Sequence, residues 1–423
     1  MAQSDIQIST TPPLPGSKLV QETNSALETI ATDFSGNVDP AAYASAYTTW
    51  ADTGSGDLKR RNAANSSWEV VGRIFPKTTE NSSGDVTVQG SLTVKDRLIA
   101  PVLGLGSFIK ADPDAPAFAK TSKYQPVIKA GLQVSFSDGT SYVWDKQTDI
   151  DVTHNDIGVD HAIWVCNDGR AKASENFTAP PESGVWRLIG GFHFAPGSNA
   201  SGFNKGGDDA PQINEHSFWD LKFRPTCPDP RGMTLVANNV WMDIYLTGAE
   251  AIVNGSSKYN VEIADGSSPP KIPMMFGGDG SANYGSYTWF EACELAQSFG
   301  KRLPTQQEFM AAAFGTTEAS SIGTDQLITK LNDKYTSKWG LIQATGVMNV
   351  WGIERGGPYA GNSWNANTDG RGSEYAAPNA VRFGGDWSDE SYSGSRSSLW
   401  YKVASYSFAG LGSRFASNHL QLD

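Results

Sequence analysis

The sequence predicts an α+β protein of several domains in which β-strands predominate. Its 423 residues exceed one ordinary core, because domains commonly hold about 100 to 200 residues. Glycine (44 residues) and aromatic side chains (11%) are abundant, whereas charged residues make up only 18%. This composition excludes a disordered chain and disfavours a coiled coil, so short strands joined by elaborate loops are expected.

The first segment, residues 1–75, is predicted to form a unit of its own. Apolar residues recur at spacings of three and four within 27–34 and again within 43–50, which predicts two short amphipathic helices. Residues 57–75 contain two strand-like runs separated by a polar turn, and a hairpin is expected there. Residues 76–106 are predicted to be a linker and a short β shaft.

Residues 107–202 are predicted to form a β-sandwich. Short strands at the spacing typical of sandwiches are expected at 127–130, 133–136, 142–144, 162–166 and 186–194. The pair Asp138-Gly139 is typical of a hairpin turn. A segment rich in Gly and Asn, 196–202, indicates the end of this domain.

The remaining residues, 203–423, are predicted to combine two helices with a loop-rich β region. Apolar side chains within 289–299 share one helical face. Thr305 followed by Glu308 has the spacing of a capping box, which predicts a second helix over 306–314.

Charge and motif content exclude several function classes. The net charge is −12, so binding to nucleic acid or anionic lipid is not expected. No apolar run approaches the roughly 18 residues of a membrane span, and no secretory signal begins the chain. The five histidines are scattered and the three cysteines lie far apart, so neither a metal site nor a disulfide framework is predicted. The common catalytic and nucleotide-binding motifs are absent, which predicts no enzyme and no cofactor.

The last forty residues have the most informative composition. From Arg382 to Asp423, serine and glycine alternate with Tyr, Trp and Phe. This mixture is typical of evolved binding surfaces, where rigid aromatic side chains bury area at low entropic cost and small polar groups adapt. A β-rich core segment would account for the composition equally well.

The segment 300–309 (GKRLPTQQEF) resembles the helix entry of formylglycine-generating-enzyme domains, a branch of the C-type lectin fold. The motifs VWG at 350–352 and RFGGDW at 382–387 resemble later elements of that family. The resemblance implies a C-type lectin fold for 203–423. It does not extend to oxidase activity, which needs cysteines in the C-terminal half, because Cys293 is the last cysteine. The calcium-binding motifs EPN, QPD and WND are also absent.

From residue 107 onward the chain more closely resembles the major tropism determinants of phages that carry a diversity-generating retroelement. The stretches that carry this resemblance are 191–200, 229–237, 257–261 and 393–396. It implies a β-sandwich followed by a C-type lectin domain, assembled as a homotrimer at the tip of a tail fibre. Receptor-contacting side chains would lie in the last forty residues.

Transferred residue by residue, the diversified positions are Asp386, Ser388, Glu390, Tyr392, Leu399, Tyr401, Lys402, Tyr406, Phe408, Gly410, Leu411 and Phe415. The first four alternate with a period of two, which predicts that they share one side of an extended segment. The residues expected to form the scaffold between them are Gly384, Gly385, Trp387, Gly394, Arg396, Trp400 and Arg414.

Residues 1–106 resemble instead the attachment regions of other phage and prophage tail fibres, especially around 58–74. The resemblances together imply a virion tail-fibre protein, made in the host cytoplasm, that binds a bacterial surface receptor, either protein or glycan. Its other partners would be further copies of itself and, through the N-terminal region, other tail proteins. Two alternatives are a bacterial diversity-generated surface-binding protein and a non-catalytic formylglycine-generating-enzyme-like domain.

Overall fold

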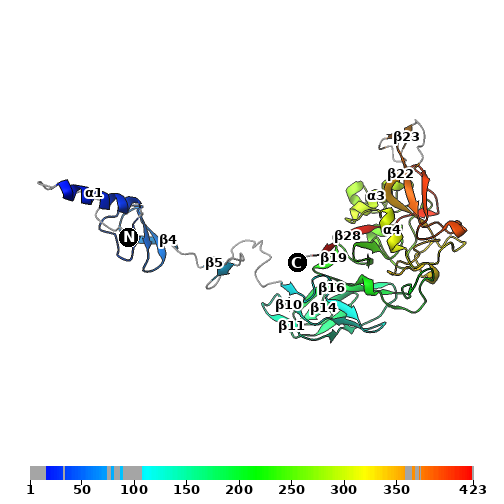
Figure 1. Ribbon diagram of the computed structural model, residues 1–423, viewed down its shortest axis with the longest axis horizontal. Helices are drawn as coiled ribbons and strands as arrows, with labels where there is room; N and C mark the ends of the chain where they lie inside the picture. Colours follow the sequence, from blue (N-terminus) through cyan, green and yellow to red (C-terminus); the bar gives the residue numbers. More distant parts are fainter. Residues whose placement is uncertain are drawn as a thin grey trace. The chain divides into compact units, whose positions relative to one another are not determined.

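The computed structural model describes residues 16–31, 34–73, 78–80, 86–88, 107–357, 364–366, 371 and 373–421. The chain divides into two compact units, Met1–Ile99 and Ala100–Asp423 (Figure 1). Among the helices in these ranges, none is long and apolar enough to cross a membrane. The finer limits of the four predicted segments remain predictions.

The first unit contains one helix and a four-stranded sheet of order β1-β2-β3-β4. Its elements are α1 (Gly16–Ala31), β1 (Ser35–Gly36), β2 (Thr49–Asp52), β3 (Asp57–Arg61) and β4 (Trp68–Arg73). The predicted hairpin is confirmed, because β3 and β4 pair antiparallel. A short pair, β5 (Thr78–Glu80) and β6 (Val86–Val88), follows, and the rest of the predicted linker and shaft lies outside the described residues.

The prediction of two short helices in this unit is wrong. The single helix α1 ends at Ala31, and residues 43–50 pass through turns into β2. Burial alternates along β2, where Trp50 is buried between two half-buried neighbours. Tyr47 has a φ of 69°, a turn conformation, so the helix-like spacing of the aromatic residues arises from a turn joined to a strand.

The second unit begins with a β-sandwich. Its strands are β7 (Phe108–Ile109), β8 (Phe118–Lys120), β9 (Pro126–Ile128), β10 (Leu132–Ser135), β11 (Ser141–Trp144), β12 (Thr148–Asp149), β13 (Asp151–Val152), β14 (Val159–Cys166), β15 (Ala171–Ser174), β16 (Trp186–Ala195), β17 (Gln212–Ile213) and β18 (Trp219–Asp220). Two small sheets, β11-β10-β7 and β12-β9-β8, share a core with a larger sheet, β13-β15-β14-β16-β17, to which β18 is added through β16. Phe118, Phe136 and Phe192 are among the fully buried side chains of this core.

The five strands predicted for the sandwich are confirmed as β9, β10, β11, β14 and β16. The predicted hairpin turn is confirmed as well, because the Gly139 N–H donates to the Phe136 carbonyl and Gly139 has a φ of +85°. After residue 202, β17 and β18 both pair with β16. The large sheet therefore continues beyond the predicted end of the sandwich, and an η1 turn (Glu215–Ser217) lies between its last two strands.

The described residues after Asp220 form two four-stranded sheets and three α-helices. Its strands are β19 (Phe223–Pro225), β20 (Met233–Val236), β21 (Val240–Asp243), β22 (Asn349–Gly356), β23 (Trp364–Ala366), β24 (Ser373–Tyr375), β25 (Asn379–Phe383), β26 (Ser398–Lys402), β27 (Leu411–Gly412) and β28 (Ala416–Gln421). The sheet orders are β19-β28-β21-β20 and β26-β25-β22-β27, and β23 pairs only with β24. The C-terminal strand β28 thus lies between the first strands of the region.

The helices of this region are α2 (Ala251–Asn254), α3 (Trp289–Ser298) and α4 (Gln306–Ala312), with 3-10 turns η2 (Met274–Phe276), η3 (Asp333–Tyr335) and η4 (Glu390–Tyr392). Both predicted helices are confirmed. The Thr305 side chain accepts from the Glu308 N–H, and the Glu308 carboxylate accepts from the Thr305 N–H, so the predicted capping box begins α4. Thr288 and Glu291 form a second capping box at the start of α3.

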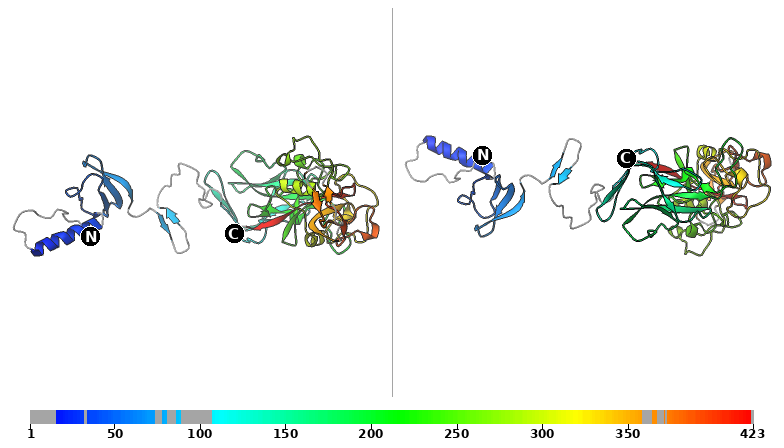
Figure 2. Two further views of the ribbon diagram at one scale, coloured as in Figure 1. Left: turned by 90° about the horizontal axis from the view of Figure 1, so that it is seen from above. Right: turned by 90° about the horizontal axis from the view of Figure 1, so that it is seen from below.

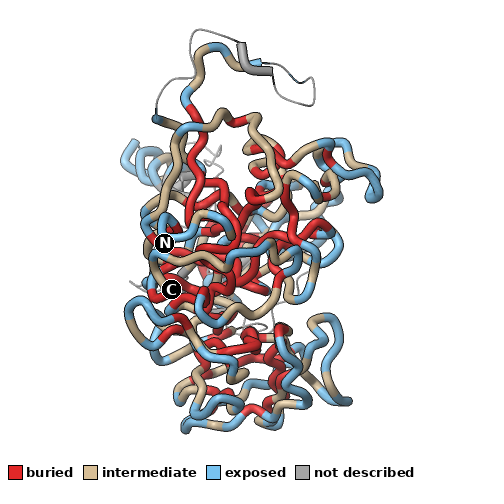
Figure 3. Tube along the Cα trace, turned by 90° about the vertical axis from the view of Figure 1, so that its right-hand side faces the viewer, coloured by how far each residue is buried: buried red, intermediate tan, exposed pale blue. Residues whose placement is uncertain are grey.

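The sandwich strands β10, β11, β14 and β16 occupy one end of the second unit, and β22, α3 and α4 occupy the other (Figures 1 and 2). Buried segments fill the interior of both regions (Figure 3). In the second region, Arg414 is fully buried, and its guanidinium donates hydrogen bonds to four backbone carbonyls, those of Asp243, Ile244, Ile342 and Gln343.

Candidate functional site

The predicted receptor-contacting positions lie on consecutive pieces of the second sheet: the turn after β25, η4, β26, the loop that follows it, β27 and the residues before β28. This orange and red part of the chain forms the end of the second unit that is remote from the C-terminus (Figures 1 and 2). Central strands β22 and β25 support it from below, because β25 pairs with both β22 and β26.

The turn after β25 is organised by two aspartates. The Asp386 carboxylate accepts from the Ser388 N–H at 2.8 Å and from the Ser388 hydroxyl at 2.7 Å. The Asp389 carboxylate accepts from the Asp386 N–H at 2.8 Å, and the Asn349 amide lies 3.2 Å from both carboxylates. This network fixes a compact turn, and Asp386 itself is buried.

The expected extended segment at 386–392 is therefore wrong. After the turn, residues Glu390–Tyr392 form η4, and Glu390 has a φ of 48°. The period-two spacing assumed a strand, but the aspartate side chains offer the backbone a competing turn. Ser388, Glu390 and Tyr392 are nevertheless exposed, and Tyr392 keeps 83% of its surface open to solvent.

Strand β26 carries the next group of positions. Leu399 pairs with Arg382 of β25 and is half-buried, whereas Tyr401 is 56% exposed. Lys402 is half-buried at the end of the strand, and its Nζ lies 4.3 Å from the ring centre of Tyr406 and 5.0 Å from that of Tyr401. The strand thus presents a cation within an aromatic surface.

Tyr406 and Phe408 complete this aromatic surface. Their ring centres lie 5.4 Å apart, and both side chains are half-buried. The Arg382 guanidinium lies beneath them and beneath Tyr401, 5.2 to 5.6 Å from the three ring centres. The name aromatic surface is used below for Tyr401, Tyr406 and Phe408.

Four of the predicted positions are buried in the folded chain: Asp386, described above, and three later residues. Gly410 packs so closely that an added Cβ would lie 2.6 Å from the Phe408 ring and 2.9 Å from the Asp386 carboxylate. Leu411 and Phe415 are fully buried in a core formed with α3. In this structure Asp386, Gly410, Leu411 and Phe415 are therefore buried, whereas Ser388, Glu390, Tyr392 and Tyr401 are exposed.

The expected scaffold residues divide similarly. Gly384 and Gly385 have φ values of +89° and +79°, and a Cβ on Gly385 would lie 2.3 Å from the Ser393 hydroxyl, so both positions require glycine. Trp387 and Trp400 were expected to be buried, but both are half-buried and pack against the rim of a core. Arg396 is exposed.

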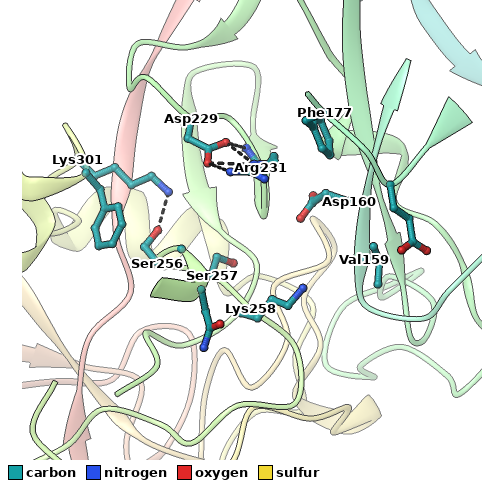
Figure 4. Close-up of a pocket in the computed structure, with 13 residues that line it drawn as sticks. Val159, Asp160, Phe177, Asp229, Arg231, Ser256, Ser257, Lys258 and Lys301 are labelled. Carbon is teal, nitrogen blue, oxygen red and sulfur yellow. Dashed lines mark hydrogen bonds and ion pairs between the residues drawn. The ribbon is translucent and has the colours of Figure 1, made fainter. Parts of the chain in front are cut away.

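A second polar site, a pocket of about 140 Å³, lies where the sandwich contacts the following region (Figure 4). Val159 and Asp160 of β14 form one wall, and Ser256, Ser257 and Lys258 lie opposite. Burial raises the pKa of Asp160, but His193 at 3.1 Å and the Gly232 N–H at 2.9 Å lower it by more.

Asp229, Arg231 and Lys301 of this pocket are also paired. Asp229 binds Arg231 through both oxygens, and the Lys301 ammonium lies 2.6 Å from Asp243 and 2.7 Å from Ser256. The pocket therefore joins the two regions through satisfied polar contacts. Within the described residues, no group of three His, Cys, Asp or Glu side chains could hold a metal ion.

Two residues of the surface could not be assigned from the sequence. In the sequence Arg382 stands out only as part of the RFGGDW motif, and no pattern singles out Asn349. Both act across strands that are distant in sequence, since β22 and β26 flank β25. The nearest signal in the sequence is the composition of β25, whose five residues are all buried and include one cation, Arg382.

The region after Asp220 is a C-type lectin-like scaffold that presents one set of side chains at its far end, and this architecture is shared with the solved structures it resembles. Residues 116–220 match the family model described as the Mtd second domain. The tail fiber receptor-binding protein of Bordetella phage BPP-1 is 49% identical over 328 residues, which cover 75% of this chain and 86% of that protein.

Solved structures extend this similarity. The major tropism determinant P3c variant is 41% identical with a TM-score of 0.74, and the M1 variant is 40% identical with a TM-score of 0.75. Each alignment covers 92% of this chain and 100% or 99% of the other. The chain belongs to the major tropism determinant family. These relatives are named as tropism determinants and a receptor-binding protein, not as enzymes.

Proposed function

We propose that this chain is the tip protein of a phage or prophage tail fibre and binds a receptor on the bacterial surface through the exposed side chains of its C-terminal face. The observation that carries the proposal is the aromatic surface together with Tyr392. Among the described residues, none of the hydroxyls of Tyr392, Tyr401 and Tyr406 makes a hydrogen bond. Exposed aromatic residues with free hydroxyls are typical anchors of binding surfaces.

The mechanism is recognition on a fixed scaffold. Buried Asp386, Gly410, Leu411 and Phe415 hold the surface in place, and exposed members of the diversified set contact the receptor. Several copies on one virion multiply a modest single-site affinity by avidity. The named receptor-binding function of the Bordetella phage relative supports this assignment.

Attachment of the purified protein to a panel of bacterial strains tests the proposal. Replacing Tyr392 and Tyr401 together by alanine should abolish attachment to a strain that binds the unaltered protein, because truncating a central aromatic anchor typically costs about 2 kcal/mol or more. Tyr124→Ala is the matched control, since Tyr124 is a similarly exposed tyrosine on the sandwich. Normal attachment of the double variant would place the receptor site elsewhere.

A homotrimer forms the second part of the proposal. A fibre tip needs several copies around one axis, and closed cyclic symmetry is the usual way to arrange identical chains. Light scattering should give three times the 45.4 kDa mass of one chain. A monomer at micromolar concentration would contradict this.

The proposal requires no catalytic turnover and no metal ion. It also places synthesis of the protein in the host cytoplasm. The last point is supported by the cysteines, all three of which are free thiols, as expected in a reducing compartment. Attachment should therefore be unchanged by EDTA. Loss of attachment on adding EDTA, with recovery on adding calcium, would contradict the metal-free mechanism.

A further inference from the structure

Two cations of the C-terminal face lack a carboxylate partner. Arg382 on β25 is only 3% exposed and lies beneath the aromatic surface, 5.2 to 5.6 Å from its three ring centres. Lys402 lies on the paired strand β26, opposite Ala380, and its Nζ is 4.3 Å from the Tyr406 ring centre. Within the described part of the chain, no Asp or Glu oxygen lies within 4.0 Å of either cation, and neither donates a hydrogen bond.

Arg382 is the exception among the buried cations of the described residues, in a chain whose net charge is −12. Other buried cations are satisfied: Lys301 pairs with Asp243 at 2.6 Å, Lys110 pairs with Asp220 at 3.1 Å, and Arg414 binds four carbonyls. A buried charge without an ionic partner is costly, and ring faces offset only part of that cost. Arg382 and Lys402 therefore keep unused capacity for an anion.

We propose that Arg382 and Lys402, framed by the aromatic surface, bind a carboxylate that belongs to an acidic side chain of a receptor protein. The inference rests on the proposed function, because it names the chemistry recognised at the same face. Lys402 reaches the surface and contacts the carboxylate. Arg382 is a positioning residue, which adds positive charge from below and holds the three rings in place.

The depth of the site favours an acidic protein side chain over an acidic sugar. The Lys402 ammonium lies over the Tyr401 and Tyr406 rings, with Arg382 almost covered behind them, so a carboxylate that reaches Lys402 must approach along the ring edges. An Asp or Glu carboxylate stands on a slim, flexible stem. A uronic acid carries its carboxylate directly on a bulky ring, which would collide with the rings first. The edges of aromatic rings carry partial positive charge and add to the attraction.

The test is the binding of polymers to the immobilised full-length protein at about 0.15 M salt, where long-range repulsion is screened. The probes are poly-L-glutamate, its neutral hydroxyethyl-glutamine derivative and polygalacturonate. The unaltered protein should bind poly-L-glutamate alone. Lys402→Gln should weaken that binding at least about tenfold, as expected for loss of a charge-assisted hydrogen bond, and Lys402→Arg should retain it.

The matched control is Lys338→Gln, which removes another lysine whose Nζ lies over a ring, 5.3 Å from the centre of Trp339, and which should bind like the unaltered protein. Arg382→Met tests the positioning role and should also weaken binding. Absence of poly-L-glutamate binding, or equal losses in Lys402→Gln and Lys338→Gln, would overturn the inference. Preference for polygalacturonate would overturn the assignment to a protein side chain.

Failure of this inference can be distinguished from failure of the proposed function. If the tyrosine double variant loses cell attachment while Lys402→Gln attaches normally and poly-L-glutamate does not bind, the carboxylate site is wrong and the binding face stands. If the tyrosine double variant attaches normally, the proposed function fails whichever polymer binds.

Discussion

Arg414 and Arg382 are both buried arginines of the lectin-like region, but their surroundings differ. Arg414 is enclosed by backbone: its guanidinium donates to four carbonyls, and burial lowers its pKa to about 9, so it is still charged at neutral pH. Arg382 is enclosed by three aromatic rings and makes no hydrogen bond within the described residues. The first arrangement is complete in the folded chain. The second has no acceptor for the guanidinium within the described residues.

The largest effect is expected from Arg414→Met. Four carbonyls that now accept from the guanidinium would lose their donors in a fully buried site, and Asp243 would keep only Lys301 as a cation. The free energy of unfolding should fall by about 3 to 5 kcal/mol, as for other broken buried ionic networks. Denaturant unfolding measures this change.

Arg382→Met is the counterpart and should change the unfolding free energy by no more than about 1 kcal/mol, because an unpaired charge is exchanged for a side chain that packs well against rings. If both variants lose stability equally, Arg382 stabilises the fold as Arg414 does, and the two arginines do not differ in role.

Phe415→Ala and Tyr392→Ala extend the contrast to the diversified positions. Phe415 is fully buried, and its ring centre lies 6.4 Å from that of Phe299. Its truncation to alanine should therefore lower the free energy of unfolding by about 3 to 5 kcal/mol. Tyr392 is almost completely exposed. Its truncation to alanine should lower the free energy of unfolding by no more than about 0.5 kcal/mol, while attachment is lost. Thermal melts beside an attachment assay separate the two. A Phe415 variant that melts normally but does not attach would restore Phe415 to the receptor contacts.

Trp387 and Trp400 should lie between these extremes. Each packs against the rim of a core without being enclosed by it, so truncation to alanine should cost about 1 to 3 kcal/mol rather than the loss expected for a buried tryptophan. Thermal melts of the two single variants measure this. Losses as large as that of Phe415→Ala would show that both rings are enclosed in the assembled protein.

Sequence-based predictions succeeded where the structure depends on contacts between residues that are close in sequence. The α4 capping box and the turn at Gly139 depend on contacts between near neighbours, and both were predicted correctly. The strands of the sandwich were found for the same reason, since turns and apolar runs mark them locally. The helix expected at 43–50 failed because its spacing came from a turn that precedes a strand.

The candidate site depended on longer-range contacts. The turn at Asp386 is fixed by Asn349, and the position of Arg382 is set by rings that follow it by about twenty residues. Neither contact leaves a periodic signal in the sequence. The family resemblance predicts receptor contacts within the last forty residues, and that stays a prediction. The folded arrangement separates Tyr392 and Tyr401 at the surface from Leu411 and Phe415 in the core.

The smallest predicted effect is the loss of stability at low pH that arises from buried histidines. Burial lowers the pKa of His161, His216 and His419, so the unfolded chain takes up protons at a higher pH than the folded chain does. Stability is therefore fully present above the unfolded value near 6.5 and falls as the pH drops below it. Asp160 is an acid whose pKa is lowered in the folded chain. Its contribution to stability therefore persists on acidification until the pH approaches the ordinary pKa of a carboxyl group.

His161 allows this prediction to be tested at one site. It is fully buried on β14, stacked 5.1 Å from Phe192, and its Nε2 lies 2.8 Å from the His154 carbonyl. Between pH 7.5 and 5.5 the melting temperature should fall, and His161→Gln should flatten that dependence. A variant with an unchanged slope would assign the loss to the other two histidines, and a rise in melting temperature on acidification would contradict the prediction. Because these histidines lie away from the aromatic surface, attachment measured below the melting transition should not follow the same pH profile.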